Sequence, residues 1–252
     1  MSADGMIVTG ACRRRMAPEF QAVIARAVER VSALGQSHSV YVYGSVATGM
    51  AQVGSSDVDL VTVGLDPAAA AQLGKDLSAE FASLCRGVDI GAAQLSDYDG
   101  PGDAAYGNRA FLRHYCVHLA GPDVGLGWSD FRADKAAARG FNGDIGLCAD
   151  RWRTEVLRQP TPVLLGRRVA RKTLFAVAGL VGVHDAIWTT DRVAAARRWG
   201  VVKPELAGSL GTLVAWSSTP RTDPAPSEVH AVLGGVVADV VGAFRRRIGL
   251  WR

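Results

Sequence analysis

The residues best suited to chemistry lie between positions 44 and 59, where a glycine and a serine precede two aspartates. Gly44 and Ser45 follow a short β-branched and aromatic run, and eleven residues separate them from Asp57, Val58 and Asp59. Alternate side chains of a β-strand share a face, so the carboxylates of Asp57 and Asp59 should project to one side. Crowded carboxylates raise each other's pKa unless a cation neutralises them, and Mg²⁺ prefers oxygen ligands together with substrate phosphates. The pattern therefore predicts a magnesium site.

A third aspartate, Asp89, lies between two aliphatic residues in a later run that is typical of a strand. If this strand pairs with the one that carries Asp57 and Asp59, three carboxylates share one face. Such a face can hold two metal ions, with Asp89 as the general base for an attacking hydroxyl. Gly44 permits close backbone approach, and Ser45 adds a hydroxyl and an N–H for the terminal phosphates of a nucleotide. The chemistry indicated is nucleotidyl transfer.

The elements that position these residues are predicted from the spacing of apolar side chains. Steps of three and four residues predict helices, and β-branched or alternating runs predict strands. In the first half this gives a helix over 16–34, strands over 39–43, 57–63 and 88–95, a short helix between the first two strands, and an alanine-rich helix from Pro67 toward Cys85. The turn-rich, acidic segment 96–108 is predicted to be a mobile loop beside the active site.

The second half of the chain has apolar residues at the spacing of a helical protein. Helices are predicted over 110–119, 128–138, 146–157, 166–183, 191–200, 204–216 and 227–248, with proline-marked breaks at 159–162 and 219–226. The expected fold class is α+β: a catalytic domain with a small mixed sheet at residues 1–125, followed by an all-α helical bundle domain at residues 126–252. The active site should lie in the cleft between them.

Composition excludes several classes of protein. The chain has 252 residues with 48% hydrophobic content, which supports a sizeable core rather than disorder. No uncharged apolar run approaches the roughly 20 residues of a membrane span, and the first residues lack the order of a signal peptide. The four cysteines are widely spaced without a CxxC pair, so neither a zinc site nor a disulfide framework is indicated. We expect a soluble, cytoplasmic protein with no membrane partner.

The run of Gly-Ser, eleven residues, Asp-Val-Asp and a single acid in a following strand resembles the DNA polymerase β-like nucleotidyltransferase superfamily. Within it, the chain is most similar to the aminoglycoside adenylyltransferases that modify streptomycin and spectinomycin. The resemblance implies that Gly44, Ser45 and Ser56 hold phosphates and that Asp57 and Asp59 bind metal. It also implies that Asp89 is both the base and a metal ligand, and that Arg192 replaces a lysine that reaches the triphosphate.

By this resemblance the reaction moves AMP from ATP to a hydroxyl of an aminoglycoside-like small molecule and releases pyrophosphate, with Mg²⁺ as cofactor. Two alternatives stay open. Seven basic residues against one acid between Arg151 and Lys172 fit an acceptor such as tRNA, as in toxin-like nucleotidyltransferases that act on tRNA or a protein. The chain could also be a catalytically silent nucleotide-binding module. In favour of a cationic acceptor, Asp97, Asp99 and Asp103 offer three carboxylates, and Trp152 offers a stacking surface.

Overall fold

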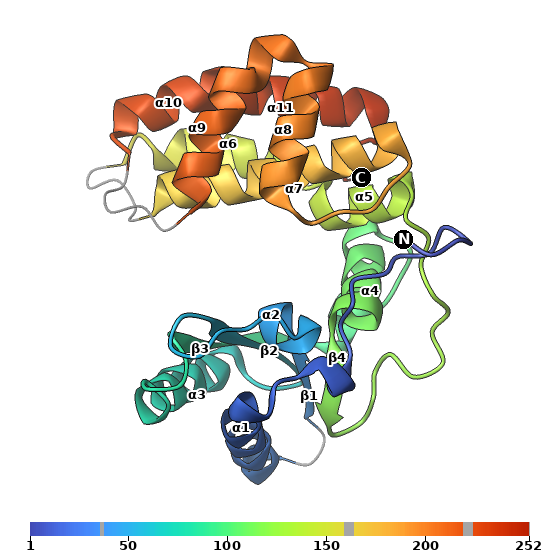
Figure 1. The fold of residues 1–252 in the computed structure, drawn as a ribbon, viewed down its shortest axis with the longest axis vertical. Helices are drawn as coiled ribbons and strands as arrows, with labels where there is room; N and C mark the ends of the chain where they lie inside the picture. Colours follow the sequence, from blue (N-terminus) through green and yellow to red (C-terminus); the bar gives the residue numbers. More distant parts are fainter. Residues whose placement is uncertain (36–37, 159–163, 219–223, 252) are drawn as a thin grey trace. The chain divides into compact units, whose positions relative to one another are not determined.

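The computed structural model describes residues 1–35, 38–158, 164–218 and 224–251, and they form two compact units (Figure 1). The sheet unit comprises Ile7–Pro101 and Asn108–Phe131. The helical unit comprises Met1–Met6, Gly102–Gly107 and Arg132–Arg252. The first residues of the chain thus belong to the helical unit. The predicted domain boundary after residue 125 stays a prediction.

The sheet unit is built on a small mixed sheet, as the sequence predicts. Its strands are β1 (Ser39–Tyr43), β2 (Asp57–Val63), β3 (Gly87–Ala93) and β4 (Val117–Ala120), in the order β3-β2-β1-β4. β1 is antiparallel to both neighbours, whereas β2 and β3 are parallel. β1 and β2 have the predicted bounds. β4 was not predicted, and the expected helix over 110–119 is wrong at its end because the chain leaves the helix at Tyr115 and pairs with β1.

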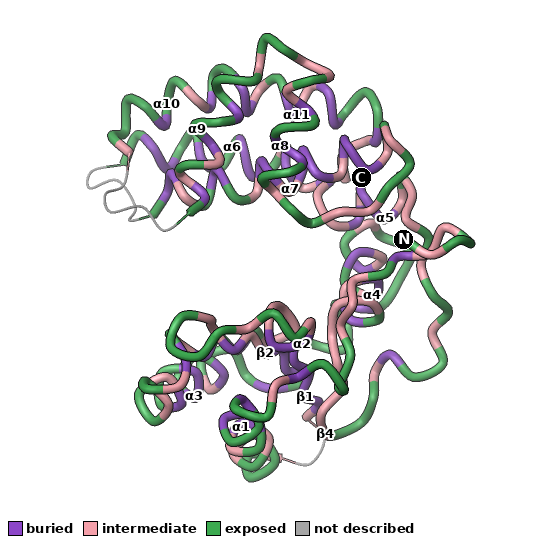
Figure 2. Tube along the Cα trace, viewed as in Figure 1, coloured by how far each residue is buried: buried purple, intermediate pink, exposed green. Residues whose placement is uncertain are grey.

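Helices α1 (Gln21–Leu34) and α3 (Pro67–Glu80) supply the main apolar core of this unit. Asp66 fixes the start of α3, since its Oδ1 accepts hydrogen bonds from the N–H groups of Ala68 and Ala69, and Pro67 takes the first helical position. The short α2 (Gly44–Thr48) connects β1 to the segment before β2. Val58 and Leu60 of β2 are completely buried in the core formed with α1 and α3. Figure 2 shows buried segments along β2. The other face of β2 is therefore available at its start.

The predicted mobile loop over 96–108 is in large part helical. A 3-10 turn covers Leu95–Tyr98, and α4 (Asp103–Tyr115) begins seven residues before the predicted helix. Asp97 accepts a hydrogen bond from the N–H of Gln94, and the guanidinium of Arg109 donates to the carbonyls of Tyr98 and Gly100. The turn-forming residues of this segment begin a helix and do not form a long loop.

The helical unit packs around one long helix. α7 (Leu165–Asp185) contacts α5 (Lys135–Asn142), α6 (Ile145–Glu155), α8 (Arg192–Val202), α9 (Ala207–Ser217) and α11 (Val236–Arg247), while α10 (Pro226–Gly234) packs on α6 and α11. The helix expected over 128–138 is wrong: Asp134 caps a helix that begins at Lys135. The helix expected over 227–248 is two helices, interrupted at Gly235. The proline break at 159–162 and most of the one at 219–226 lie outside the described residues.

Large aromatic side chains fill the core of the helical unit. Trp199 is fully buried there. Trp152 is only 2% exposed, so the expectation that it offers a stacking surface for a substrate is wrong. Among the described residues, the stretch Pro226–Arg247 has the length and composition of a membrane span. Its buried residues belong to this core, and the helix is broken at Gly235.

Candidate active site

The start of β2 and the middle of β3 bring two of the predicted catalytic aspartates together. In the parallel pairing of these strands Asp59 is the register partner of Asp89, and Asp57 is the partner of Gly87. Register partners on neighbouring strands project to the same face of a sheet. Asp59 is half-buried and Asp89 is exposed, whereas the intervening Val58 is completely buried on the other face. The predicted shared face of the aspartates is confirmed.

Gly44 lies directly under the carboxylate of Asp59. Its φ of 72° is in the left-handed region, and a Cβ at this position would overlap Oδ2 of Asp59. Glycine is therefore required twice, by the backbone conformation and by the space that Asp59 occupies. Ser45 follows in the first turn of α2, where its carbonyl accepts hydrogen bonds from the N–H groups of Met50 and Ala51. The backbone of Gly44 and Ser45 thus lies against the carboxylate of Asp59 and is fixed there by these hydrogen bonds.

The pKa of Tyr43 responds to the negative charges of this site. It is the register partner of Asp59 across β1 and β2, and its ring meets Phe111 edge-on at 5.1 Å between centroids. Burial raises the pKa of Tyr43 well above its ordinary value, and the carboxylates of Asp59 and Asp89 raise it further. Both carboxylates therefore lie close enough to the phenol to disfavour its anion, and Tyr43 stays protonated at neutral pH.

Asp57 has a partner that sequence reasoning missed. The Nε of Arg86 donates to Oδ1 of Asp57 at 2.9 Å, and a second guanidinium N–H donates to Oδ2. This hydrogen bonding raises the pKa of Arg86. Arg86 directly precedes β3, and β2 begins at Asp57, so the β2–β3 pairing brings them side by side. Arg86 belongs to no recognisable motif. Its position directly before the strand that carries Asp89 is the sequence feature that could have pointed to it.

Ser56 and Arg192, which the family resemblance singles out, lie in different units. The hydroxyl of Ser56 accepts a hydrogen bond from the N–H of Gln52 at 2.9 Å, which closes the turn that leads into β2. Its carbonyl accepts from the N–H of Arg86. Arg192 is the first residue of α8 in the helical unit, with its guanidinium carbon 5.3 Å from the ring centroid of Phe175. Arg192 belongs to the helical unit, and the aspartates belong to the sheet unit.

The donors at this face suit a divalent ion only in part. Asp59 and Asp89 offer carboxylate oxygens on one face of the sheet. Both negative charges raise the pKa of Tyr43, and a bound cation would neutralise them. Asp57 is engaged by Arg86 and would have to exchange this partner for a metal. Within the described residues no three acidic, histidine or cysteine side chains converge as a ready metal cluster. The residues fit Mg²⁺ once Arg86 has released Asp57.

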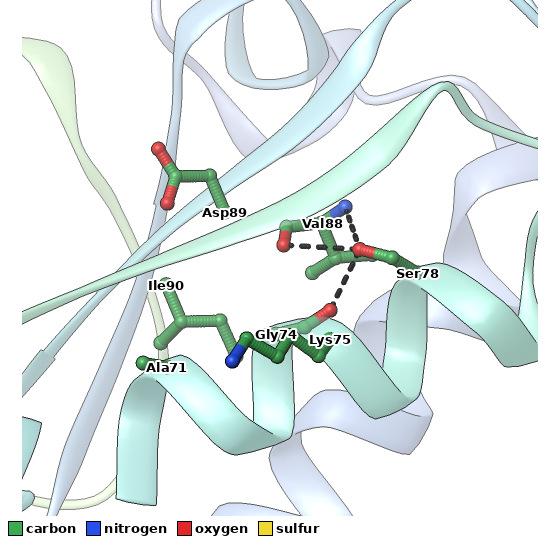
Figure 3. A pocket seen from close by; sticks show the side chains of 7 residues that line it. All are labelled: Ala71, Gly74, Lys75, Ser78, Val88, Asp89 and Ile90. Carbon is green, nitrogen blue, oxygen red and sulfur yellow. Dashed lines mark hydrogen bonds between the residues drawn. The ribbon is translucent and has the colours of Figure 1, made fainter. Parts of the chain in front are cut away.

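A groove of about 430 Å³ runs between α3 and β3 beside this face. Figure 3 shows that Asp89 and Ile90 project to opposite sides of β3, with Ile90 toward α3. The hydroxyl of Ser78 accepts from the N–H of Val88 at 2.8 Å and donates to the carbonyl of Gly74, which ties α3 to this edge strand. The groove therefore borders Asp89 without receiving its carboxylate.

Comparison with known families matches the nucleotidyltransferase domain to residues 24–86. The matched stretch contains Gly44, Ser45, Asp57 and Asp59, and it ends at Arg86. Residues 24–86 are thus similar to a nucleotidyltransferase domain. Asp89 lies three residues beyond the match and belongs to the site through the β2–β3 register. No curated protein matches the chain. The superfamily resemblance is thereby supported, while the nearer resemblance to aminoglycoside adenylyltransferases is not.

Two expectations about charge are corrected by ion pairs. Asp103 begins α4 and accepts a hydrogen bond from Nε of Arg139 at 2.6 Å, and Asp97 accepts one from the N–H of Gln94, so two of the three predicted carboxylates already have partners. In the basic stretch between Arg151 and Lys172, at least four of the seven cations pair with described acids of the helical unit. These pairs are Arg151 and Arg168 with Glu155, Arg153 with Asp150, and Lys172 with Asp144. The stretch is therefore less basic than its sequence indicates.

Proposed function

We propose that the nucleotidyltransferase domain transfers AMP from ATP to a hydroxyl of an aminoglycoside-like small molecule, with release of pyrophosphate and dependence on Mg²⁺. The observation that carries the proposal is the register pairing of Asp59 with Asp89 above Gly44. The family match at residues 24–86 supports nucleotidyl transfer as the reaction class. The choice of AMP and of the acceptor rests on the family resemblance alone, and cytoplasmic location remains part of the proposal.

Each residue has one role in this scheme. The acceptor oxygen bonds to the α-phosphorus of ATP, the bond from that phosphorus to pyrophosphate breaks, and the acceptor proton passes to the carboxylate of Asp89. Asp57 and Asp59 would hold the divalent ions, which supply charge neutralisation at the phosphates when bound. Gly44, Ser45 and Ser56 present the phosphate-facing backbone and hydroxyls, and Arg192 would add a cationic contact. The exposed position of Asp89 gives an acceptor hydroxyl access to it.

The test is incubation of the full chain with ATP and Mg²⁺ against a panel of aminoglycosides, followed by mass spectrometry of the small molecules. The proposal expects an acceptor that gains the mass of one AMP unit and an equal amount of pyrophosphate. Asp89→Asn is the reference for background chemistry, and Asp99→Asn, an exposed acid outside the site, is the matched control. A panel without any mass gain contradicts the small-molecule acceptor.

Transfer to tRNA is the second candidate, and the seven basic residues between Arg151 and Lys172 are the feature that favours it. Binding to tRNA would weaken steeply with salt because phosphate contacts release counterions. The catalytically silent alternative predicts nucleotide binding without pyrophosphate release in wild type and Asp89→Asn alike. The register pairing of Asp59 and Asp89 argues against it, since binding alone does not require a base beside the metal ligands.

A further inference from the structure

β3 is an edge strand of the sheet, and alternate residues along it direct their backbone groups away from β2. The carbonyls of Gly91 and Ala93 face β2, because they accept hydrogen bonds from the hydroxyl of Thr62 and the N–H of Gly64. Alternate residues of a strand bond to the same neighbour in a parallel pair, so the residues between them direct their N–H and C=O groups outward. These outward residues are Val88, Ile90 and Ala92.

Helix α3 covers this edge at one residue and leaves the next two open. The hydroxyl of Ser78 accepts a hydrogen bond from the N–H of Val88 at 2.8 Å. Outside the ladder with β2, no described residue donates to or accepts from the backbone of Ile90 or Ala92. A Cβ at Gly74 would lie 3.7 Å from the backbone nitrogen of Ile90, so glycine keeps α3 clear of that N–H. Unpaired edge groups of this kind are a template for a further strand.

The groove between α3 and β3 follows this open edge. It holds about 430 Å³, and on its α3 side the small residues Ala71 and Gly74 leave room beside Ile90. Figure 3 shows Ile90 on the groove side of β3 and Asp89 on the opposite side. Successive side chains of an added strand alternate in the same way. A strand paired with β3 would therefore place every second side chain in the groove, and its residue opposite Asp89 would project to the face of that carboxylate.

One cation gives the groove a charge preference. Lys75 lines the groove and is exposed. Lys172 and Lys203 pair with acids at 2.6 Å and 3.4 Å, whereas Lys75 forms no ion pair with a described residue. On the opposite face an added strand meets the carboxylate of Asp89, which disfavours an acid there. Charge complementarity thus favours an acidic side chain toward the groove and a neutral one toward Asp89.

We propose that the open edge of β3 binds an extended segment of a partner protein by strand addition, with an acidic side chain of the segment against Lys75. In this mode of recognition main-chain hydrogen bonds give affinity, and pockets for alternate side chains give specificity. The segment runs past Asp89 at the flank of the proposed active site. The proposal does not depend on the transfer reaction, because it uses only the backbone groups of Ile90 and Ala92, the groove and Lys75.

The test is fluorescence anisotropy of a labelled, capped peptide of alternating threonine and valine, with glutamate at one valine position, titrated with the full chain. Wild type should bind it saturably. Ala92→Pro removes an outward N–H and leaves the ladder with β2 intact, so it should weaken binding about fivefold or more, as expected for one lost hydrogen bond. Ala92→Ser keeps the N–H and is the matched control, with wild-type affinity. No saturable binding, or equal binding by all three proteins, would overturn the proposal.

Exchanging the charges tests the acidic character of the partner. A peptide with lysine in place of the glutamate should bind wild type about two- to fivefold more weakly, the range of an exposed ion pair. Lys75→Glu should reverse this preference. Arg14→Glu, at an exposed position of the same unit, makes the same change in net charge and should keep the wild-type preference. An unchanged preference in Lys75→Glu would show that the groove does not select an acidic segment.

Amide hydrogen exchange, measured by NMR, tests the edge residue by residue. In the free protein the amides of Ile90 and Ala92 should exchange faster than those of Asp89 and Gly91, which the alternation directs toward β2. Peptide at ten times its Kd should slow exchange at Ile90 and Ala92 by about tenfold. Protection of both amides in the free, dilute protein would mean that the edge is already covered and would contradict the proposal.

Sedimentation of the full chain without peptide distinguishes a partner protein from a second copy. If two copies paired through β3, the chain would sediment as a dimer that Ala92→Pro dissociates, and this result would overturn the assignment to a partner segment. The proposal expects wild type and Ala92→Pro to sediment with the same mass, since the variant changes only the binding of an added strand.

Discussion

Asp59 and Asp89 are register partners on parallel neighbouring strands, and their carboxylates share one face of the sheet. Burial raises the pKa of Tyr43, and the charges of both carboxylates raise it further. Gly44 leaves the space that the carboxylate of Asp59 occupies, because any side chain there would displace that carboxylate. Asp57, two residues before Asp59 on the same strand, is held by a hydrogen bond from Arg86.

Asp89→Asn should lower the rate of nucleotidyl transfer by about 10²–10⁴-fold, because an amide cannot accept the proton of the acceptor hydroxyl. Binding of the nucleotide should change much less than the rate. The measurement is single-turnover release of pyrophosphate at saturating ATP. Asp99→Asn should react as wild type does, and equal rates for the two variants would exclude Asp89 as the base.

Gly44→Ala should destabilise the fold by more than Gly54→Ala. Both glycines have φ near 75°, so each alanine pays about 1–2 kcal/mol for the left-handed conformation. Only at Gly44 would the new Cβ also meet the carboxylate of Asp59, whereas nothing lies within 4 Å of a Cβ at Gly54. Urea unfolding of both variants measures the difference, and activity should be lost in Gly44→Ala alone. Equal effects would mean that Asp59 is not held against Gly44.

Arg86→Gln should strengthen binding of Mn²⁺ in the absence of nucleotide, since the guanidinium no longer competes for Asp57. The free energy of unfolding should change by less than about 1 kcal/mol, because Arg86 is 53% exposed and such ion pairs are screened by water. Electron paramagnetic resonance of free Mn²⁺ gives the affinity. Arg113→Gln, which breaks the exposed pair with Asp130, is the control. Weaker Mn²⁺ binding in Arg86→Gln would show that Arg86 positions Asp57 as a ligand.

Acidification should destabilise the sheet unit through His114. Its Nε2 accepts a hydrogen bond from the N–H of Phe131 at 2.8 Å, and burial lowers its pKa below the ordinary value. The unfolded chain then binds more protons than the folded one, so the stabilisation is complete above about pH 6.5 and is lost as the pH falls. Urea unfolding at pH 7.5 and pH 5.5 should show this loss in wild type. It should shrink in His114→Gln and persist in His230→Gln, whose histidine is exposed.

The catalytic strands could be predicted from sequence because their signals are local. Alternation along Asp57–Val63 sets both the strand and the face of its acids, and the β-branched run at Ser39–Tyr43 sets its neighbour. β4 could not be predicted in this way, since four residues form a strand only through pairing with β1. The break at Gly235 was missed because the apolar pattern continues across it.

The residues of the candidate site also differ in whether local sequence or tertiary pairing reveals them. Gly44, Asp57 and Asp59 belong to a contiguous motif, whereas Arg86 acquires its role only when β3 pairs with β2. Ion pairs also depend on tertiary contacts, which is why the acidity of 96–108 and the basicity of 151–172 were overestimated from composition. Charge read along a sequence ignores the partners that the fold supplies.

Nucleotidyl transfer at this site is measured as transfer of label from the α-phosphate of each of the four NTPs, with Mg²⁺, to aminoglycosides and separately to total tRNA. Asp57→Ala provides the blank. Label from ATP should be joined covalently to an aminoglycoside, dependent on Mg²⁺ and absent from the blank. Label on tRNA would assign the same chemistry to another acceptor, and no label above the blank in any reaction would contradict nucleotidyl transfer by the pair Asp59 and Asp89.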